Sequence, residues 1–172
     1  MHTRRMVLIA LLTAVAGVLH AVEGWLPLPV AVPGAKLGLA NIVSLVVLEL
    51  FGWRAALLVG LLRVLLGTLL GGALLGPAFA MALSGAVVST VVMAAALPRL
   101  CPPFSLVGIS VMGAAVHNIA QMLIAAIVVA SPGLLWYLPY LLLFAVPTGL
   151  MTGLTARHFL AKLPREFAVR KP

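Results

Sequence analysis

The polar side chains that interrupt the apolar stretches of this chain are few, and their types suit the binding of a small polar molecule. They combine cationic, anionic and amide groups: His20, Glu23, Lys36, Asn41, Arg63, His117, Asn118 and Gln121. An ionisable group inside a membrane is costly unless it has a partner, a cavity or access to the interface. We therefore interpret this set as the candidate substrate-binding residues.

Their positions place most of them toward one end of the apolar stretches. His20 and Glu23 come at the end of the first stretch, whereas Lys36 opens the second. His117 and Gln121 are four residues apart, so a helix carries both on one face. Proline and glycine before Lys36 predict a helix start there, whose positive end favours an anion. The spacing therefore predicts one external pocket with positive character.

Each of these residues also has a purely structural interpretation. Arg63 can be neutralised by Glu49, because a buried guanidinium requires a partner. His20 and Glu23 can pair at the membrane surface. Asn41, Asn118 and Gln121 can form hydrogen bonds between helices, as polar residues commonly do in membranes. The clustering of all of them at a common depth favours a site.

The elements that position these groups are membrane-spanning helices. The chain has 172 residues, of which 64% are hydrophobic and only 8% are charged. Stretches of about 20 apolar residues are long enough to cross a bilayer as helices. Proline- and glycine-rich joints separate six of them, at residues 5–24, 34–51, 54–72, 77–97, 104–130 and 134–158. We predict an all-α membrane protein in which residues 1–172 form a single six-span domain.

The basic residues predict the orientation of this bundle. They lie at both ends of the chain and in alternate joints: Arg4, Arg5, Arg54, Arg99, Arg157, Lys162, Arg165, Arg170 and Lys171. Lysine and arginine are enriched in cytoplasmic loops. Both termini are therefore expected in the cytoplasm, with the protein in the cytoplasmic (inner) membrane and in contact with its lipids. The first stretch resembles a signal peptide in outline, but its apolar core is longer than such a segment requires.

Several functional classes are disfavoured by composition. The net charge of +8 is accounted for by membrane topology and by attraction to anionic lipids, so we expect no nucleic acid partner. The single cysteine, Cys101, provides neither a disulfide nor a metal site. No phosphate-binding GxxxxGK[ST] loop occurs, so ATP hydrolysis by that route is excluded. We expect no metal and no cofactor.

Several motifs resemble a known family of membrane proteins. The chain carries EGWLP at residues 23–27, PGAKLGLANIV at 33–43, RVLLG at 63–67, SGA at 84–86 and GAAVHNIAQ at 113–121. These segments resemble the Gx transporter family, whose members are often labelled heptaprenyl diphosphate synthase component I. That family is similar to the substrate-binding subunits of energy-coupling factor transporters. The resemblance covers nearly the whole chain.

The resemblance implies two different functions. A prenyl diphosphate synthase usually binds its substrate through Mg²⁺ held by clustered aspartates, because hard cations prefer anionic oxygens. This chain has no aspartate, and its three acids lie on separate segments. We therefore expect a non-enzymatic transport subunit that captures a small vitamin-like or anionic molecule from outside. An accessory component of isoprenoid or quinone synthesis is the alternative.

The resemblance also implies a partner. In the similar transporters, small residues of the first helix dock onto an energising membrane subunit that works with ATPases. Small residues at spacings of three and four occur here in the first stretch: Ala10, Ala14, Gly17 and Ala21. Such residues also serve close helix packing within one bundle. The sequence leaves both interpretations open.

Overall fold

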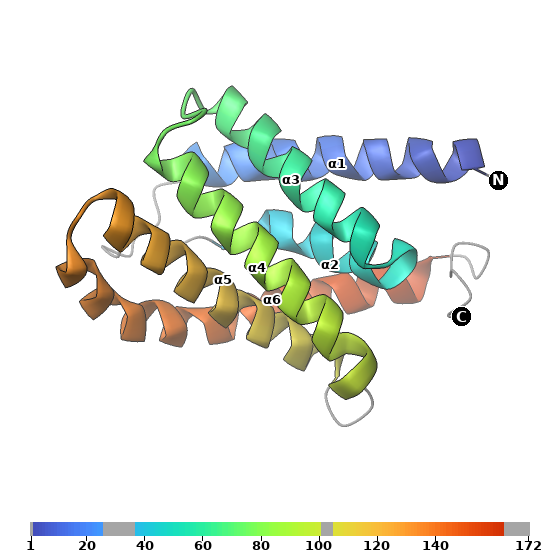
Figure 1. Ribbon diagram of the computed structural model, residues 1–172. Helices are drawn as coiled ribbons and strands as arrows, with labels where there is room; N and C mark the ends of the chain where they lie inside the picture. The colour runs from blue at the N-terminus through green and yellow to red at the C-terminus, as the bar shows by residue number, and fades with distance from the viewer. Residues whose placement is uncertain (1, 26–36, 101–104, 164–172) are drawn as a thin grey trace.

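The structure is a computed structural model that describes residues 2–25, 37–100 and 105–163. In these ranges the chain forms helices and no strand, which confirms the predicted all-helical class (Figure 1). The α-helices are α1 (His2–Trp25), α2 (Leu39–Phe51), α3 (Trp53–Leu70), α4 (Pro77–Leu100), α5 (Leu106–Val128) and α6 (Leu138–Lys162), with a short 3₁₀ helix, η1 (Pro132–Tyr137), before α6.

The second helix is shorter than predicted. Five helices are long and apolar enough to cross a membrane, whereas α2 has 13 residues and is about 20 Å long at 1.5 Å per residue. The second stretch was predicted to begin at residue 34, but Leu37 and Gly38 are not helical and the helix begins at Leu39. Gly38 adopts a left-handed conformation, with φ of 79°, immediately before the helix. Residues 34–36 lie outside the described ranges.

This short helix forms the centre of the bundle. It packs against α1, α3 and α6, and every residue from 43 to 48 is buried. A helix that is apolar on all sides is stable only when other helices surround it. Helices α1, α3 and α6 provide most of that cover, and the five longer helices present many large apolar side chains on their outer surfaces, as a protein in lipid requires.

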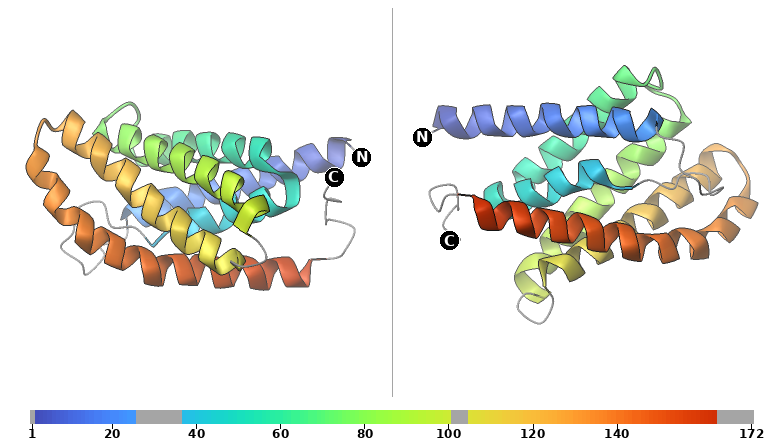
Figure 2. Two further views of the ribbon diagram at one scale, coloured as in Figure 1. Left: turned by 60° about the horizontal axis from the view of Figure 1, so that its bottom comes forward. Right: turned by 180° about the vertical axis from the view of Figure 1, so that it is seen from behind.

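The longer helices follow one another around α2. α1 packs on α3, α3 on α4, α4 on α5 and α5 on α6, as the two further views show (Figure 2). The first residues of α1 and the last residues of α6 lie at the same end of the bundle (Figure 1). This arrangement agrees with an even number of passages and with termini on one side of the membrane.

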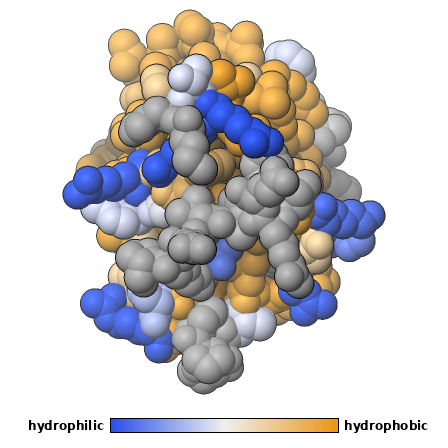
Figure 3. All heavy atoms as spheres, turned by 90° about the vertical axis from the view of Figure 1, so that its right-hand side faces the viewer, coloured by the Kyte–Doolittle hydropathy of each residue, from blue (hydrophilic) through white to orange (hydrophobic). Residues whose placement is uncertain are grey.

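The basic side chains gather at that same end. Arg5 is exposed there and donates a hydrogen bond from Nη2 to the carbonyl of Phe51, at the last residue of α2 (3.0 Å). The view onto this end shows hydrophilic residues between apolar ones (Figure 3). Arg54, whose guanidinium lies over the Trp53 ring, belongs to the same end. These positions agree with a cytoplasmic assignment by the positive-inside rule.

Glycines allow neighbouring helices to approach closely. A Cβ atom at Gly149 of α6 would lie 2.5 Å from Cα of Val111 in α5, closer than packed atoms ever come. Between α4 and α5 the arrangement is reciprocal: Gly85 accommodates the ring of His117, and Gly113 accommodates Met93. Close packing of α4 on α5 therefore explains why glycine occupies both of these positions.

Candidate functional site

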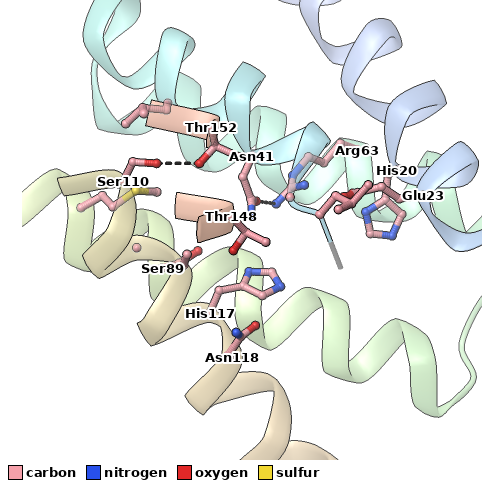
Figure 4. Close-up of a pocket in the computed structure, with 16 residues that line it drawn as sticks. His20, Glu23, Asn41, Arg63, Ser89, Ser110, His117, Asn118, Thr148 and Thr152 are labelled. Carbon is pink, nitrogen blue, oxygen red and sulfur yellow. Dashed lines mark hydrogen bonds between the residues drawn. The ribbon is translucent and has the colours of Figure 1, made fainter. Parts of the chain in front are cut away.

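A polar cavity lies inside the bundle, and all six α-helices or the residues just before them contribute to its walls (Figure 4). Six of the eight predicted site residues line it: His20, Glu23, Asn41, Arg63, His117 and Asn118. The apolar bundle thus encloses one concentrated group of hydrogen-bonding side chains. The cavity volume is about 30 Å³. That volume suffices for about one water molecule, so the described conformation leaves little free space at the site.

Arg63 and Asn41 form the central contact of this cavity. Arg63, in the middle of α3, is only 3% exposed, and its Nη2 donates a hydrogen bond of 2.6 Å to Oδ1 of Asn41 (Figure 4). A guanidinium has five N–H donors. Within the described ranges the buried Nε of Arg63 has no hydrogen-bond partner. The side chain therefore retains donor capacity that faces a polar cavity.

Glu23 occupies the start of α2. Its Oε1 accepts a hydrogen bond of 2.8 Å from the backbone N–H of Leu39, the first residue of the helix. A carboxylate at this position is stabilised by the positive end of the helix. The predicted anion site at the start of the second helix is corrected accordingly, because the helix begins at Leu39 and the chain's own carboxylate lies there. Glu23 also acts electrostatically on Arg63.

These contacts differ from the pairing of Arg63 with Glu49 that the sequence also allowed. The acid that acts on its guanidinium is Glu23, and the acceptor of its hydrogen bond is Asn41. Glu49 is eight residues beyond Asn41 on α2, which separates the two by about 12 Å along the helix. The carboxylate that acts electrostatically on Arg63 is therefore that of Glu23 in α1.

The two histidines each pack against a glycine of a neighbouring helix. The ring of His20 in α1 lies where a Cβ atom of Gly67 in α3 would be, and the ring of His117 in α5 lies against Gly85 in α4. His20 is buried, whereas His117 is half-buried. The close approach of the helices fixes both rings at the cavity wall.

The remaining predicted residues have different positions. Asn118 lines the cavity, but its Nδ2 donates a hydrogen bond of 2.8 Å to the carbonyl of Leu141 in α6, so it also joins two helices. Gln121 is buried and does not line the cavity, because it lies one helical turn beyond His117. Lys36 lies outside the described residues.

Four polar residues of the cavity were not predicted from the sequence: Ser89, Ser110, Thr148 and Thr152. Ser110 and Thr152 are buried and their hydroxyl oxygens are 2.7 Å apart, joining α5 to α6. A signal for them was available. Ser110 precedes His117 by seven residues and therefore shares its helix face, and Thr148 and Thr152 are four residues apart.

The predicted partner surface on α1 is divided by the fold. Gly17 and Ala21 are buried, and a Cβ atom at Gly17 would lie 3.0 Å from Cβ of Leu66 in α3. These two residues therefore serve packing within the bundle and are not accessible to another protein. Ala10 and Ala14 are exposed on the outer face of α1.

The described residues contain no cluster of three metal-binding side chains. No three His, Cys, Asp or Glu side chains of residues 2–25, 37–100 and 105–163 lie close enough together to hold an ion. The chemistry of the cavity consists of donors and acceptors fixed on packed helices. Such groups recognise a polar ligand by hydrogen bonds and charge.

Comparison with known proteins identifies a family. No curated protein and no solved structure matches the chain significantly. A family profile described as heptaprenyl diphosphate synthase component I matches residues 12–159, which include every residue that lines the cavity. The chain, a multi-pass membrane protein, therefore belongs to the heptaprenyl diphosphate synthase component I family.

Proposed function

We propose that the protein is a solute-binding transport subunit of the cytoplasmic membrane that captures a small anionic or amide-bearing molecule from outside. The observation that carries this proposal is Arg63, a guanidinium 3% exposed at the wall of a polar cavity, with its Nε lacking a partner among the described residues. An ionisable residue inside a membrane is by default a candidate functional residue.

The energetics of Arg63 favour an anionic ligand. Removing a guanidinium from water costs several kcal/mol, and the hydrogen bond to neutral Asn41 recovers only part of that. Glu23 contributes charge, but one of its oxygens is already engaged by Leu39. A carboxylate or phosphate oxygen would accept hydrogen bonds from the unused donors of Arg63 in a bidentate geometry. His20, His117 and Asn118 would add further donors or acceptors around it.

Capture of a solute requires that the small cavity expands. A volume of about 30 Å³ is too small for a vitamin-sized solute, whose pockets are about 300–1,000 Å³. A ligand that binds only an open form shifts the population toward that form. The cavity lies toward the end of the bundle opposite the exposed arginines, which supports entry from outside.

Movement of the solute across the membrane would require a partner. The chain has no nucleotide-binding loop, so energy would come from an associated membrane subunit with ATPases. The exposed Ala10 and Ala14, with their large apolar neighbours on α1, provide a surface on which a second transmembrane helix can pack.

The family description favours one further candidate function. It names a component of heptaprenyl diphosphate synthase, and an accessory role in isoprenoid synthesis would agree with that name. Catalysis by this chain alone is disfavoured, because Glu23 is engaged at the start of α2 and no aspartate is present. The cavity can hold an anion without providing the carboxylate cluster that binds Mg²⁺.

A prenyl transfer assay tests the choice between these functions. The purified protein, in detergent or lipid, is supplied with an allylic diphosphate, isopentenyl diphosphate and Mg²⁺. We expect no elongated product, and we expect ligand binding to require neither ATP nor metal. Formation of a longer prenyl chain by the protein alone would refute the transport function.

A further inference from the structure

A second, larger cavity lies beside the polar one. It is a partly open space with a volume of about 270 Å³, lined by the end of α1, the end of α3 with the turn after it, and the start of α4. Most of its walls are small apolar residues, including Ala21, Gly24, Gly71 and Ala78, together with the ring of Trp25. Thr68 also lines it, but its hydroxyl donates to the carbonyl of Val64 within α3. The cavity is therefore predominantly apolar.

One side chain, His20, belongs to the walls of both cavities. Its ring lies against Gly67, which itself lines the second cavity. His20 lies beside Glu23 and Arg63 in the polar cavity (Figure 4), and it also lines the apolar space.

We propose that the two cavities form one bipartite site for a small amphipathic anion. Its anionic head contacts Arg63, and its apolar tail occupies the second cavity beyond His20. This inference rests on the proposed function and specifies the class of solute. A wholly polar solute would use only the cavity of about 30 Å³ and would leave the larger space empty.

The dimensions of the cavities support this division. The polar cavity holds one water-sized group, which suits a compact head with modest expansion. An apolar cavity of about 150 Å³ is sufficient for benzene, so the second cavity, at about 270 Å³, can hold a longer hydrocarbon segment. Each methylene transferred from water into such a space raises affinity about fourfold.

Carboxylates of increasing length serve as probes. The full-length protein in phosphatidylcholine nanodiscs is dialysed against radiolabelled acetate, butanoate and octanoate, and the uptake by empty nanodiscs is subtracted. We expect affinity to rise by a factor of ten or more from butanoate to octanoate. An Arg63→Gln variant should bind all three weakly, since the head contact is lost.

Trp25 reports directly on the second cavity. In a background with Trp53→Phe and Trp136→Phe, Trp25 is the only indole, and 8-bromooctanoate should quench its fluorescence at concentrations that follow binding. 8-Bromooctanol, which lacks the anion, should quench much less. Equal quenching by the alcohol would mean that the cavity accepts membrane hydrocarbon generally, which would overturn the proposal.

Gly24→Leu blocks the tail without disturbing the fold. A Cβ atom at Gly24 meets nothing within 4 Å, and leucine is favoured over glycine in a helix. We expect at least a tenfold loss of octanoate affinity with acetate affinity unchanged. Gly133→Leu, in exposed η1 and away from both cavities, is the matched control.

The outcomes test the bipartite site separately from the anion site at Arg63. Arg63-dependent binding of acetate, with octanoate binding no tighter or insensitive to Gly24→Leu, overturns the bipartite site and leaves the anion site intact. Absence of any Arg63-dependent binding of the three carboxylates contradicts both. Tail-length dependence that disappears in Gly24→Leu supports the bipartite site.

Discussion

The hydrogen bond between Arg63 and Asn41 should be strongly coupled energetically, and a double-mutant cycle measures that coupling. The change is Asn41→Ala and Arg63→Gln, separately and together. In the native protein the two side chains are joined at 2.6 Å, and Arg63 is 3% exposed. Truncation of Asn41 therefore removes this acceptor from a guanidinium that is almost fully buried.

The expected magnitude follows from the type of bond. Hydrogen bonds to charged groups contribute about 1.5–3 kcal/mol, roughly twice the value of neutral ones. Asn41→Ala alone should lower the free energy of unfolding by at least about 2 kcal/mol, since a buried charge is left with fewer partners. In the Arg63→Gln background the same change should cost about 1.5–3 kcal/mol less.

Thermal or denaturant unfolding in a fixed lipid or detergent, followed by tryptophan fluorescence, gives the four free energies. Thr155→Ala is the control for Asn41→Ala, because Thr155 is exposed on α6 and its hydroxyl is bonded within its own helix. Its effect should add to that of Arg63→Gln. If the Asn41 and Arg63 effects also add within about 0.5 kcal/mol, the contact is not the stabilising pair that we describe.

Three further predictions address the helix start, the packing and the topology. Glu23→Ala should lower the free energy of unfolding by about 1–2 kcal/mol, and Glu23→Gln by less, because glutamine keeps an acceptor for the N–H of Leu39. The amide hydrogens at the start of α2 should also exchange faster in Glu23→Ala. Equal losses of stability in the two variants would contradict this role of Glu23. Gly149→Ala should cost about 1–3 kcal/mol or prevent assembly, whereas Gly24→Ala, with open space around its Cβ, should be neutral or stabilising in the same unfolding assay. Cysteines replacing Trp53 and Leu75, in a background without the native cysteine, should react with impermeant reagents from opposite sides of the membrane, and labelling from one side would reject the topology.

The fold class was predictable because it depends on composition. Long apolar segments and the alternation of basic joints are visible in the sequence, and the described helices match five of the six stretches closely. The start of the second helix was not predictable in this way. Hydropathy does not register the left-handed Gly38 or the carboxylate of Glu23, from a different helix, that accepts the first N–H of α2.

The membership of the cavity was predictable only in part. Ionisable and amide residues are conspicuous in an apolar chain, and most of them meet in the structure. Gln121 lies beyond the cavity because helix rotation and depth are set by packing, such as that of Gly149 on Val111. Ser110 and Thr152 were missed because hydroxyl side chains commonly bond to their own helix, and only the fold brings these two together.

The central claim is that Arg63 binds an anion, and mass spectrometry of copurifying small molecules tests it most directly. The wild-type protein, Arg63→Gln and Arg54→Gln are purified in parallel, since Arg54 is an exposed arginine at the opposite end of the bundle. We predict that an anionic compound is enriched with the wild type and with Arg54→Gln but is lost from Arg63→Gln. Equal enrichment with all three proteins would contradict the account.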